Sequence, residues 1–176
     1  AGENVYFITA DDEVRKHLGV APRGGAMVQP WLRGKRPVPA EQVKLKQRYR
    51  FQVEARPQGE LFFAVERPDL YTVTLNGHLV SKGDAGYWCD LSLRKLKLDP
   101  AQLVEGGNIL ELDSIYHGDL PGLESAFLLG EFGVKEMTLT APPARLAPGD
   151  WVPQGLPHYA GNLSYCYDPE LAAKPE

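Results

Sequence analysis

The chain has 176 residues and carries 19 Lys and Arg against 23 Asp and Glu, which gives a formal net charge of −4. A chain of this size can bury about 70% of its unfolded surface, so one well-formed core is expected. The slight acidic excess lacks the basic surplus that nucleic-acid binding needs, and that class of partner is excluded. Gly and Pro, with 18 and 15 residues, and an aromatic content of 10% favour a turn-rich globular domain over a disordered chain.

Membrane and redox signals are weak. No apolar run approaches the roughly 18 residues of a membrane-crossing helix, so no membrane partner is expected. The first residues lack the basic and apolar regions of a signal peptide, and we interpret the chain as cut from a longer protein. Cys89 and Cys166 fit neither a zinc site nor a disulfide-rich scaffold, and their spacing leaves open whether they pair. Both lie in strand-like alternating runs, where a buried structural role is expected.

One short segment near the N-terminus predicts a helix of about two turns. Thr9 with Asp12 three residues later resembles a capping box. Val14 and Leu18 share a face, and Gly19 stands where helices often end. The following residues, up to residue 42, are rich in Pro and Gly without periodicity and predict an extended segment.

Strand signals dominate from residue 43 onward. Residues 43–55 alternate between apolar and charged positions, which predicts a long half-buried strand. Residues 61–65 are continuously apolar and predict a strand covered on both sides. Asn76-Gly77 between two short alternating runs, 71–75 and 78–80, predicts a tight hairpin. Further strands are expected at 87–93, 96–98, 109–116, 127–129, 135–141 and 163–167.

About nine short strands with frequent turn signals predict an all-β fold, an antiparallel β-sandwich of the jelly-roll kind with a short N-terminal helix. We expect three parts: an N-terminal helix and wrapping segment at 1–42, the sandwich at 43–167, and a C-terminal tail at 168–176.

Local motifs for catalysis are missing from the sequence. The four histidines lack the spacing that places two imidazoles on one metal, and none of five serines considered as nucleophiles lies in a nucleophile elbow. The 23 acidic residues allow a carboxylate pair to be chosen anywhere, so they do not indicate a glycosidase. A structural calcium ion among loop carboxylates stays open, although no EF-hand loop is present. We therefore expect no cofactor and no catalytic residue, and the metal question is left open.

Aromatic residues in turn-rich segments are the most informative side chains. Flat rings suit the C–H faces of sugars, and a neutral hydroxyl-rich ligand needs such platforms beside a few hydrogen-bonding groups. Candidate platforms and hydroxyl partners are Trp31, Trp88, Trp151, Gln154, His158 and Tyr159. The alternative is structural, with Trp88 in the core and with Trp151 and Tyr159 closing the end of the sandwich.

An ordered set of motifs adds a family resemblance. The Asn76-Gly77 hairpin is followed by Trp88-Cys89-Asp90 and then by Gly107-Asn108 leading into alternating leucines. This order resembles the galactose-binding-like β-sandwich domains of glycoside hydrolases, including the sugar-binding domains of family 2 glycosidases.

The later part of the chain is similar to C-terminal sandwich domains of bacterial enzymes related to α-L-rhamnosidases. The similarity rests on residues 123–134, on Gly149-Asp150-Trp151 and on residues 154–165. The resemblance covers roughly residues 43–167. It implies an accessory module that is not itself an enzyme, with the catalytic residues of the parent in another domain. It therefore also implies an extracellular or periplasmic location.

The sequence leaves several functions open. The first is a module that binds a plant cell-wall polysaccharide or oligosaccharide and is attached to the catalytic domain of a parent glycoside hydrolase. The alternative is a sandwich that braces such a catalytic domain without binding sugar. A freestanding jelly-roll enzyme would need clustered histidines or a perturbed acid pair, and the sequence shows no histidine cluster.

Overall fold

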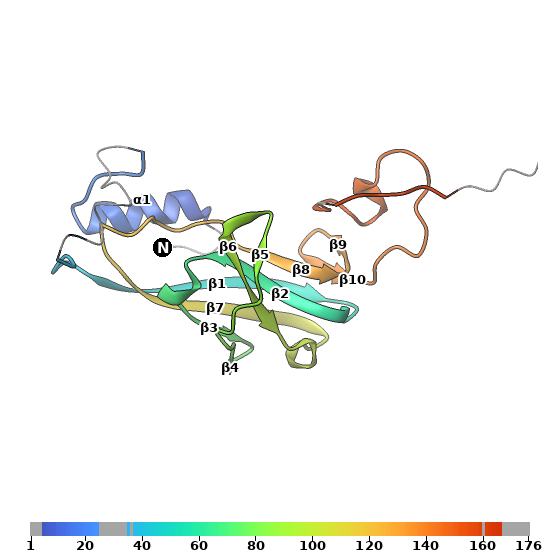
Figure 1. Ribbon diagram of the computed structural model, residues 1–176, viewed down its shortest axis with the longest axis horizontal. Helices are drawn as coiled ribbons and strands as arrows, with labels where there is room; N and C mark the ends of the chain where they lie inside the picture. The colour runs from blue at the N-terminus through green and yellow to red at the C-terminus, as the bar shows by residue number, and fades with distance from the viewer. Residues whose placement is uncertain (1–4, 25–34, 36, 160, 167–176) are drawn as a thin grey trace, which may run out of the picture.

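The structure is a computed structural model that describes residues 5–24, 35, 37–159 and 161–166. In these residues ten strands form two sheets, and one helix precedes them, which confirms the predicted all-β sandwich with a short N-terminal helix. Figure 1 shows the helix at one end of the sandwich and the segment after the last strand at the other. The elements are α1 (Phe7–His17), β1 (Val43–Val53), β2 (Gln58–Glu66), β3 (Thr72–Leu75), β4 (His78–Leu79), β5 (Tyr87–Trp88), β6 (Asp90–Leu98), β7 (Gly106–Tyr116), β8 (Phe127–Glu131), β9 (Gly133–Lys135) and β10 (Thr138–Thr140).

The larger sheet is built around the long pair β1 and β7. Its strand order is β4-β3-β7-β1-β10-β9, and β1 pairs with β7 from Val43 opposite Tyr116 to Val53 opposite Gly106. Exposure alternates along β1 as the sequence predicts, because one face meets the core and the other carries charge. On the charged face Lys46 Nζ lies 3.1 Å from Asp113 Oδ2. Such exposed cross-strand pairs contribute little stability, about 0.2–1 kcal/mol each.

The smaller sheet has the order β5-β6-β2-β8 and places β2 in its interior. Leu61, Phe63 and Val65 point into the core and are at most 2% exposed. Ala64, on the other face of β2, is fully buried as well. The continuous apolar run at 61–65 is therefore a strand covered on both sides, as predicted.

The predicted Asn-Gly hairpin joins β3 and β4. Asn76 and Gly77 have φ angles of 50° and 82°, so both residues lie in the left-handed region that a type I′ turn requires. The Asn76 side chain is fixed as well, since its Nδ2 donates to Asn108 Oδ1 at 2.8 Å and to the Gln102 carbonyl at 2.9 Å. The backbone N–H of Ile109 donates to Asn76 Oδ1 at 2.9 Å.

Four expected strands differ from the structure. The run expected at 96–98 is not a separate strand, because it belongs to β6 (Asp90–Leu98) together with residues 90–93. The run at 87–93 is interrupted at Cys89, where φ is 48° and the chain turns back so that Trp88 pairs with Asp90. The run at 135–141 is interrupted in the same way at Glu136, where φ is 55°, between β9 and β10. Both turns place a positive φ at a residue other than Gly or Asn, so no turn residue marks either position in the sequence. The strand expected at 163–167 is wrong over its described residues 163–166, which form no strand.

The helix was predicted in the right place but with the wrong contacts. It begins at Phe7, so Thr9 lies inside it, and no side-chain cap is found at Tyr6 among the described residues. Its buried residues are Asp11 and Arg15, whereas Val14 and Leu18 are only partly buried. Gly19, with φ of 67°, follows the helix end as expected.

Asp11 attaches α1 to the segment after β7. Its Oδ1 accepts hydrogen bonds from the Tyr116 hydroxyl at 2.6 Å and from the Leu123 N–H at 2.9 Å. Its Oδ2 accepts from Arg15 Nε at 2.9 Å and from Arg23 Nε at 3.3 Å. Burial by itself raises the pKa of Asp11, but the hydrogen bonds and the Arg15 charge outweigh burial and lower the pKa overall.

Candidate functional site

A groove of about 510 Å³ lies beside β8, at the edge of the sandwich. Its lining comes from β1, β5, β8, the β9–β10 hairpin and residues 155–159. Most of these side chains are apolar or aromatic, with a few polar groups among them, which is the usual composition of a ligand site. The lining residues are Tyr49, Arg50, Phe51, Trp88, Ala126, Phe127, Leu128, Leu129, Gly130, Phe132, Val134, Glu136, Met137, Leu139, Gly155, Leu156, Pro157, His158 and Tyr159.

The inner wall of the groove is continuous with the core. Phe51 and Leu139 are 9% and 7% exposed and belong to the buried cluster. Tyr49 packs on Phe63 with ring centroids 6.4 Å apart, and its hydroxyl donates to Gln47 Oε1 at 3.2 Å. Burial raises the pKa of Tyr49 to about 12, so the groove presents a neutral phenol at neutral pH.

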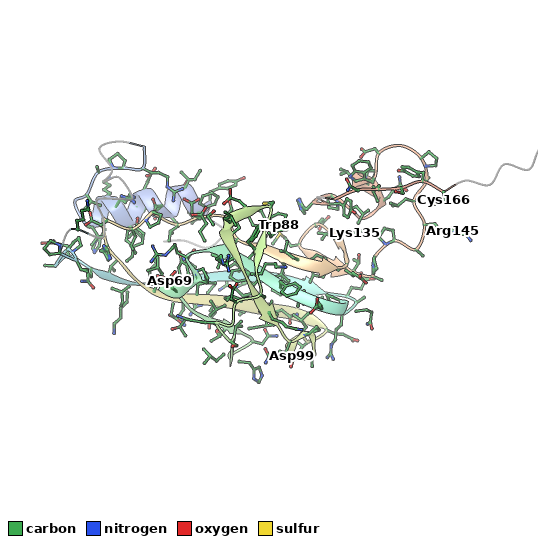
Figure 2. All side chains as sticks on the ribbon, in the orientation of Figure 1. Asp69, Trp88, Asp99, Lys135, Arg145 and Cys166 are labelled. Atoms are coloured by element: carbon green, nitrogen blue, oxygen red, sulfur yellow. The ribbon has the colours of Figure 1, made fainter. Side chains whose placement is uncertain are left out.

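Trp88 forms an aromatic wall with Phe127. Their ring centroids are 4.7 Å apart at an interplanar angle of 55°, a tilted contact. The turn at Cys89 pairs Trp88 with Asp90 at the start of β6. Trp88 is half-buried and lines the groove, so it does not occupy the core position that the structural alternative gave it. Figure 2 labels Trp88 near the β5–β6 turn.

The segment 155–159 covers the groove from the C-terminal side. It follows a short 3₁₀ turn, Val152–Gln154, and Gly155 has a φ of 94°. The Val134 N–H donates to the Gly155 carbonyl at 2.8 Å, which fixes this segment to β9. Gly133 permits this close approach, because a Cβ there would lie 3.2 Å from the Gly155 carbonyl oxygen, and it also permits the close pairing with β10, where the Cβ would lie 2.6 Å from Thr140 Oγ1.

The structure brings three of the six predicted site residues together. Trp88, His158 and Tyr159 all line the groove, and His158 and Tyr159 are exposed. The Tyr159 hydroxyl donates to the Asn162 carbonyl at 2.9 Å, which holds the ring in place. Trp31 lies outside the described residues.

Trp151 and Gln154 lie apart from this group. Trp151 is 38% exposed and precedes the 3₁₀ turn, and it does not contribute to the groove as the described residues form it. Gln154 is committed to its own loop, since its Nε2 donates to the Asp150 carbonyl at 2.7 Å and its Oε1 accepts from the Ala147 N–H at 2.7 Å. Gln154 therefore stabilises the loop that leads to His158 and Tyr159, and its side-chain amide is already engaged in hydrogen bonds within that loop.

Sequence reasoning missed the residues that complete the groove. Tyr49 and Phe51 fall on the apolar side of the alternation at 43–55, and Phe127 begins the strand expected at 127–129, without any link to Trp88 or Tyr159. Their alternation indicates burial but does not distinguish the closed core from a groove at its edge. Arg50, Glu136 and Met137 also line the groove, and no local motif indicates this.

The described residues carry no cluster of three or more His, Cys, Asp or Glu side chains that could hold a metal ion. Cys89 and Cys166 are both exposed and unpaired within this part of the chain, so the expectation of buried cysteines is wrong. Nor does any helix in the described ranges combine the length and the apolar character needed to cross a bilayer.

The chain matches no protein-family model, and no curated protein matches it.

Proposed function

We propose that the groove beside β8 binds a neutral carbohydrate chain and that the protein is a non-catalytic module of a larger, secreted polysaccharide-degrading enzyme. The observation that supports this best is the meeting of Trp88, Phe127 and Tyr159 around one open groove. Rings of this kind stack on the C–H faces of pyranoses, and His158 and Tyr49, which line the same groove, carry polar groups that can hydrogen-bond sugar hydroxyls.

The proposed contacts predict a modest affinity for carbohydrate. Stacking on two or three rings and a few hydrogen bonds only modestly exceed the cost of association, so we expect dissociation constants of roughly micromolar to millimolar. Plant cell-wall glycans are the expected ligand class, and the catalytic domain of the parent enzyme is the expected neighbour. An extracellular or periplasmic location belongs to the same proposal.

Affinity electrophoresis against xylan, pectin, galactan and β-glucan tests this function. At least one polysaccharide should retard the unmodified chain. Trp88→Ala and Tyr159→Ala should each weaken retardation by roughly threefold to tenfold, the loss of one aromatic contact. Trp151→Ala is the matched control, because Trp151 is also a partly exposed tryptophan but does not line the groove.

Two results would reject the proposal. One is the absence of retardation by every polysaccharide, and the other is unchanged retardation in a folded Trp88→Ala variant. The first result would favour the alternative, a sandwich that braces a catalytic domain. The apolar floor of the groove, formed by Leu128, Leu139 and Leu156 among others, is the feature that supports that alternative.

A further inference from the structure

The groove beside β8 continues onto the outer face of the smaller sheet. Phe127, which lines the groove, stands opposite Ala64 of β2. Leu129, which also lines it, stands opposite Phe62. Alternate residues of a strand share a face, and Phe63 points into the core, so Phe62 and Ala64 lie on the outer face. Phe62 therefore adjoins the groove, one strand spacing from Leu129.

Lys95 extends this face on the next strand, β6. It stands opposite Ala64, and its Nζ lies 4.6 Å from the centroid of the Phe62 ring. This distance is typical of a cation–π contact. The backbone is fixed as well, since the Lys95 N–H donates to the Gly86 carbonyl at 2.9 Å. The ammonium group is therefore positioned over Phe62, beside the groove.

Lys95 lacks the carboxylate partner that its neighbours on β6 have. Arg94 pairs with Asp84. Lys97, on the same face as Lys95, has its Nζ 2.9 Å from Glu60 Oε1. In the part of the chain that the structure describes, no carboxylate lies at ion-pair distance from Lys95. An ammonium group has three hydrogen-bond donors and binds most strongly to an anionic oxygen, so this group is suited to an anion on a ligand.

We propose that Lys95 makes the groove selective for a glycan whose neutral backbone carries uronic acid branches. The backbone lies on the rings of Trp88, Phe127 and Tyr159, and a branch reaches past Leu129 on the outer face. Its carboxylate then accepts hydrogen bonds from the Lys95 ammonium. This inference rests on the proposed carbohydrate binding and adds the chemical class of the ligand.

Affinity electrophoresis with paired polysaccharides tests this selectivity. Glucuronoxylan and an arabinogalactan that bears glucuronic acid are each compared with the same preparation after its carboxylates have been reduced to alcohols. Galactan and β-glucan serve as neutral ligands. The unmodified chain should bind at least one native preparation about twofold to fivefold more tightly than its reduced form, the gain from one exposed ion pair. This difference should vanish in about 0.5 M NaCl, because salt screens the ion pair.

Substitutions at two lysines separate the role of Lys95 from a general effect of charge. Lys95→Met should abolish the difference between native and reduced preparations, whereas Lys95→Arg should keep it, because a cation remains over the Phe62 ring. Lys97→Met is the matched control. It removes the same single charge from the same face of β6, but from a lysine already paired with Glu60, so the difference should persist.

The possible results distinguish this inference from the proposed function. Equal retardation by native and reduced forms, or retardation by galactan or β-glucan alone, overturns the role of Lys95 and leaves carbohydrate binding in place. A difference that persists in Lys95→Met, or that is lost equally in Lys97→Met, also overturns this role. If no polysaccharide retards the chain, the proposed carbohydrate binding fails, and the selectivity fails with it.

Discussion

Asp11 shows how a single buried carboxylate fixes the position of a helix. It has no exposed surface and accepts hydrogen bonds from α1, from Arg23 and from residues more than a hundred positions later in the chain. Its neighbour Arg15 is also buried and donates to the Leu120 carbonyl at 3.1 Å. Burying such an ion pair costs much desolvation free energy, so the pair adds little net stability. The loss of stability is large when only one partner is removed, because the other charge is then buried alone.

We expect Asp11→Asn to destabilise the fold by about 3–5 kcal/mol, because it leaves the Arg15 charge buried without its counter-charge. Urea unfolding followed by circular dichroism measures this loss. Asp12→Asn is the control, since Asp12 is exposed on the same helix and should change stability by less than about 0.5 kcal/mol. Equal stability of the two variants would contradict this role of Asp11.

The lowered pKa of Asp11 gives the same residue a pH dependence. Its folded pKa lies below the ordinary value of 3.8, so its ionised form contributes stability that is fully present above about pH 4. That contribution is lost as the pH falls through the lower folded pKa. Unfolding midpoints between pH 7 and pH 2 should therefore fall in the unmodified chain, and this fall should be smaller in Asp11→Asn. An equal fall of the unfolding midpoint in the unmodified chain and in Asp11→Asn would show that other carboxylates cause the loss of stability at low pH.

The sequence predicted this helix but not its buried face. Apolar residues at helical spacing indicate a buried face at Val14 and Leu18, whereas the structure buries Asp11 and Arg15. An ion pair at this spacing is usually exposed on a helix surface, so only knowledge of the distant partners Tyr116 and Leu123 could have revealed its burial.

The β9–β10 hairpin depends on one glycine. We expect Gly133→Ala to destabilise the fold by about 1–3 kcal/mol, because its Cβ would collide with the Thr140 side chain and the Ala141 backbone. Thermal unfolding measures the effect. Gly107→Ala in β7 is the control, since a Cβ there would meet only Gln52 Nε2 at an ordinary 3.8 Å.

Strand prediction succeeded where the side-chain pattern and the turn residues agreed. The long alternation of β1, the apolar run of β2 and the Asn76-Gly77 turn were all found from sequence. The turns at Cys89 and Glu136 were missed because both residues have a positive φ, which residues other than Gly, Asn and Asp rarely adopt. The number of strands was therefore close, while their boundaries were not.

At the scale of the whole molecule, the groove combines residues from four distant parts of the chain. Trp88, His158 and Tyr159 were predicted as candidates separately, each as a ring or polar group in a turn-rich segment. Their meeting with Tyr49 and Phe127 depends on strand order, since β1 and β8 belong to different sheets. No single-sequence pattern reports that order, so the site could be predicted only in part.

The composition of the groove predicts that binding to a neutral polysaccharide depends only weakly on salt concentration. The chain carries a net charge of only −4, and the proposed contacts are aromatic stacking and neutral hydrogen bonds. We expect retention on a neutral polysaccharide to change by less than about twofold between 0.05 and 0.5 M NaCl, because screening acts on charges. Loss of most retention at high salt would point to charged groups such as Arg50 and Glu136 as the main contacts.

The Asn76-Gly77 turn also bears on the chemical lifetime of the protein. In a flexible peptide, the glycine nitrogen of an Asn-Gly pair attacks the carbonyl carbon of the asparagine side chain and expels ammonia. Water then opens the resulting succinimide ring and leaves aspartate or isoaspartate. Here the Asn76 amide is held by Gln102, Asn108 and Ile109, so the attack geometry is hard to reach while the protein is folded. A carboxylate at this position would face the Asn108 oxygen that the amide now satisfies. Resistance to this ageing reaction is therefore a property of the folded state, and unfolding and chemical damage should accelerate each other at this turn.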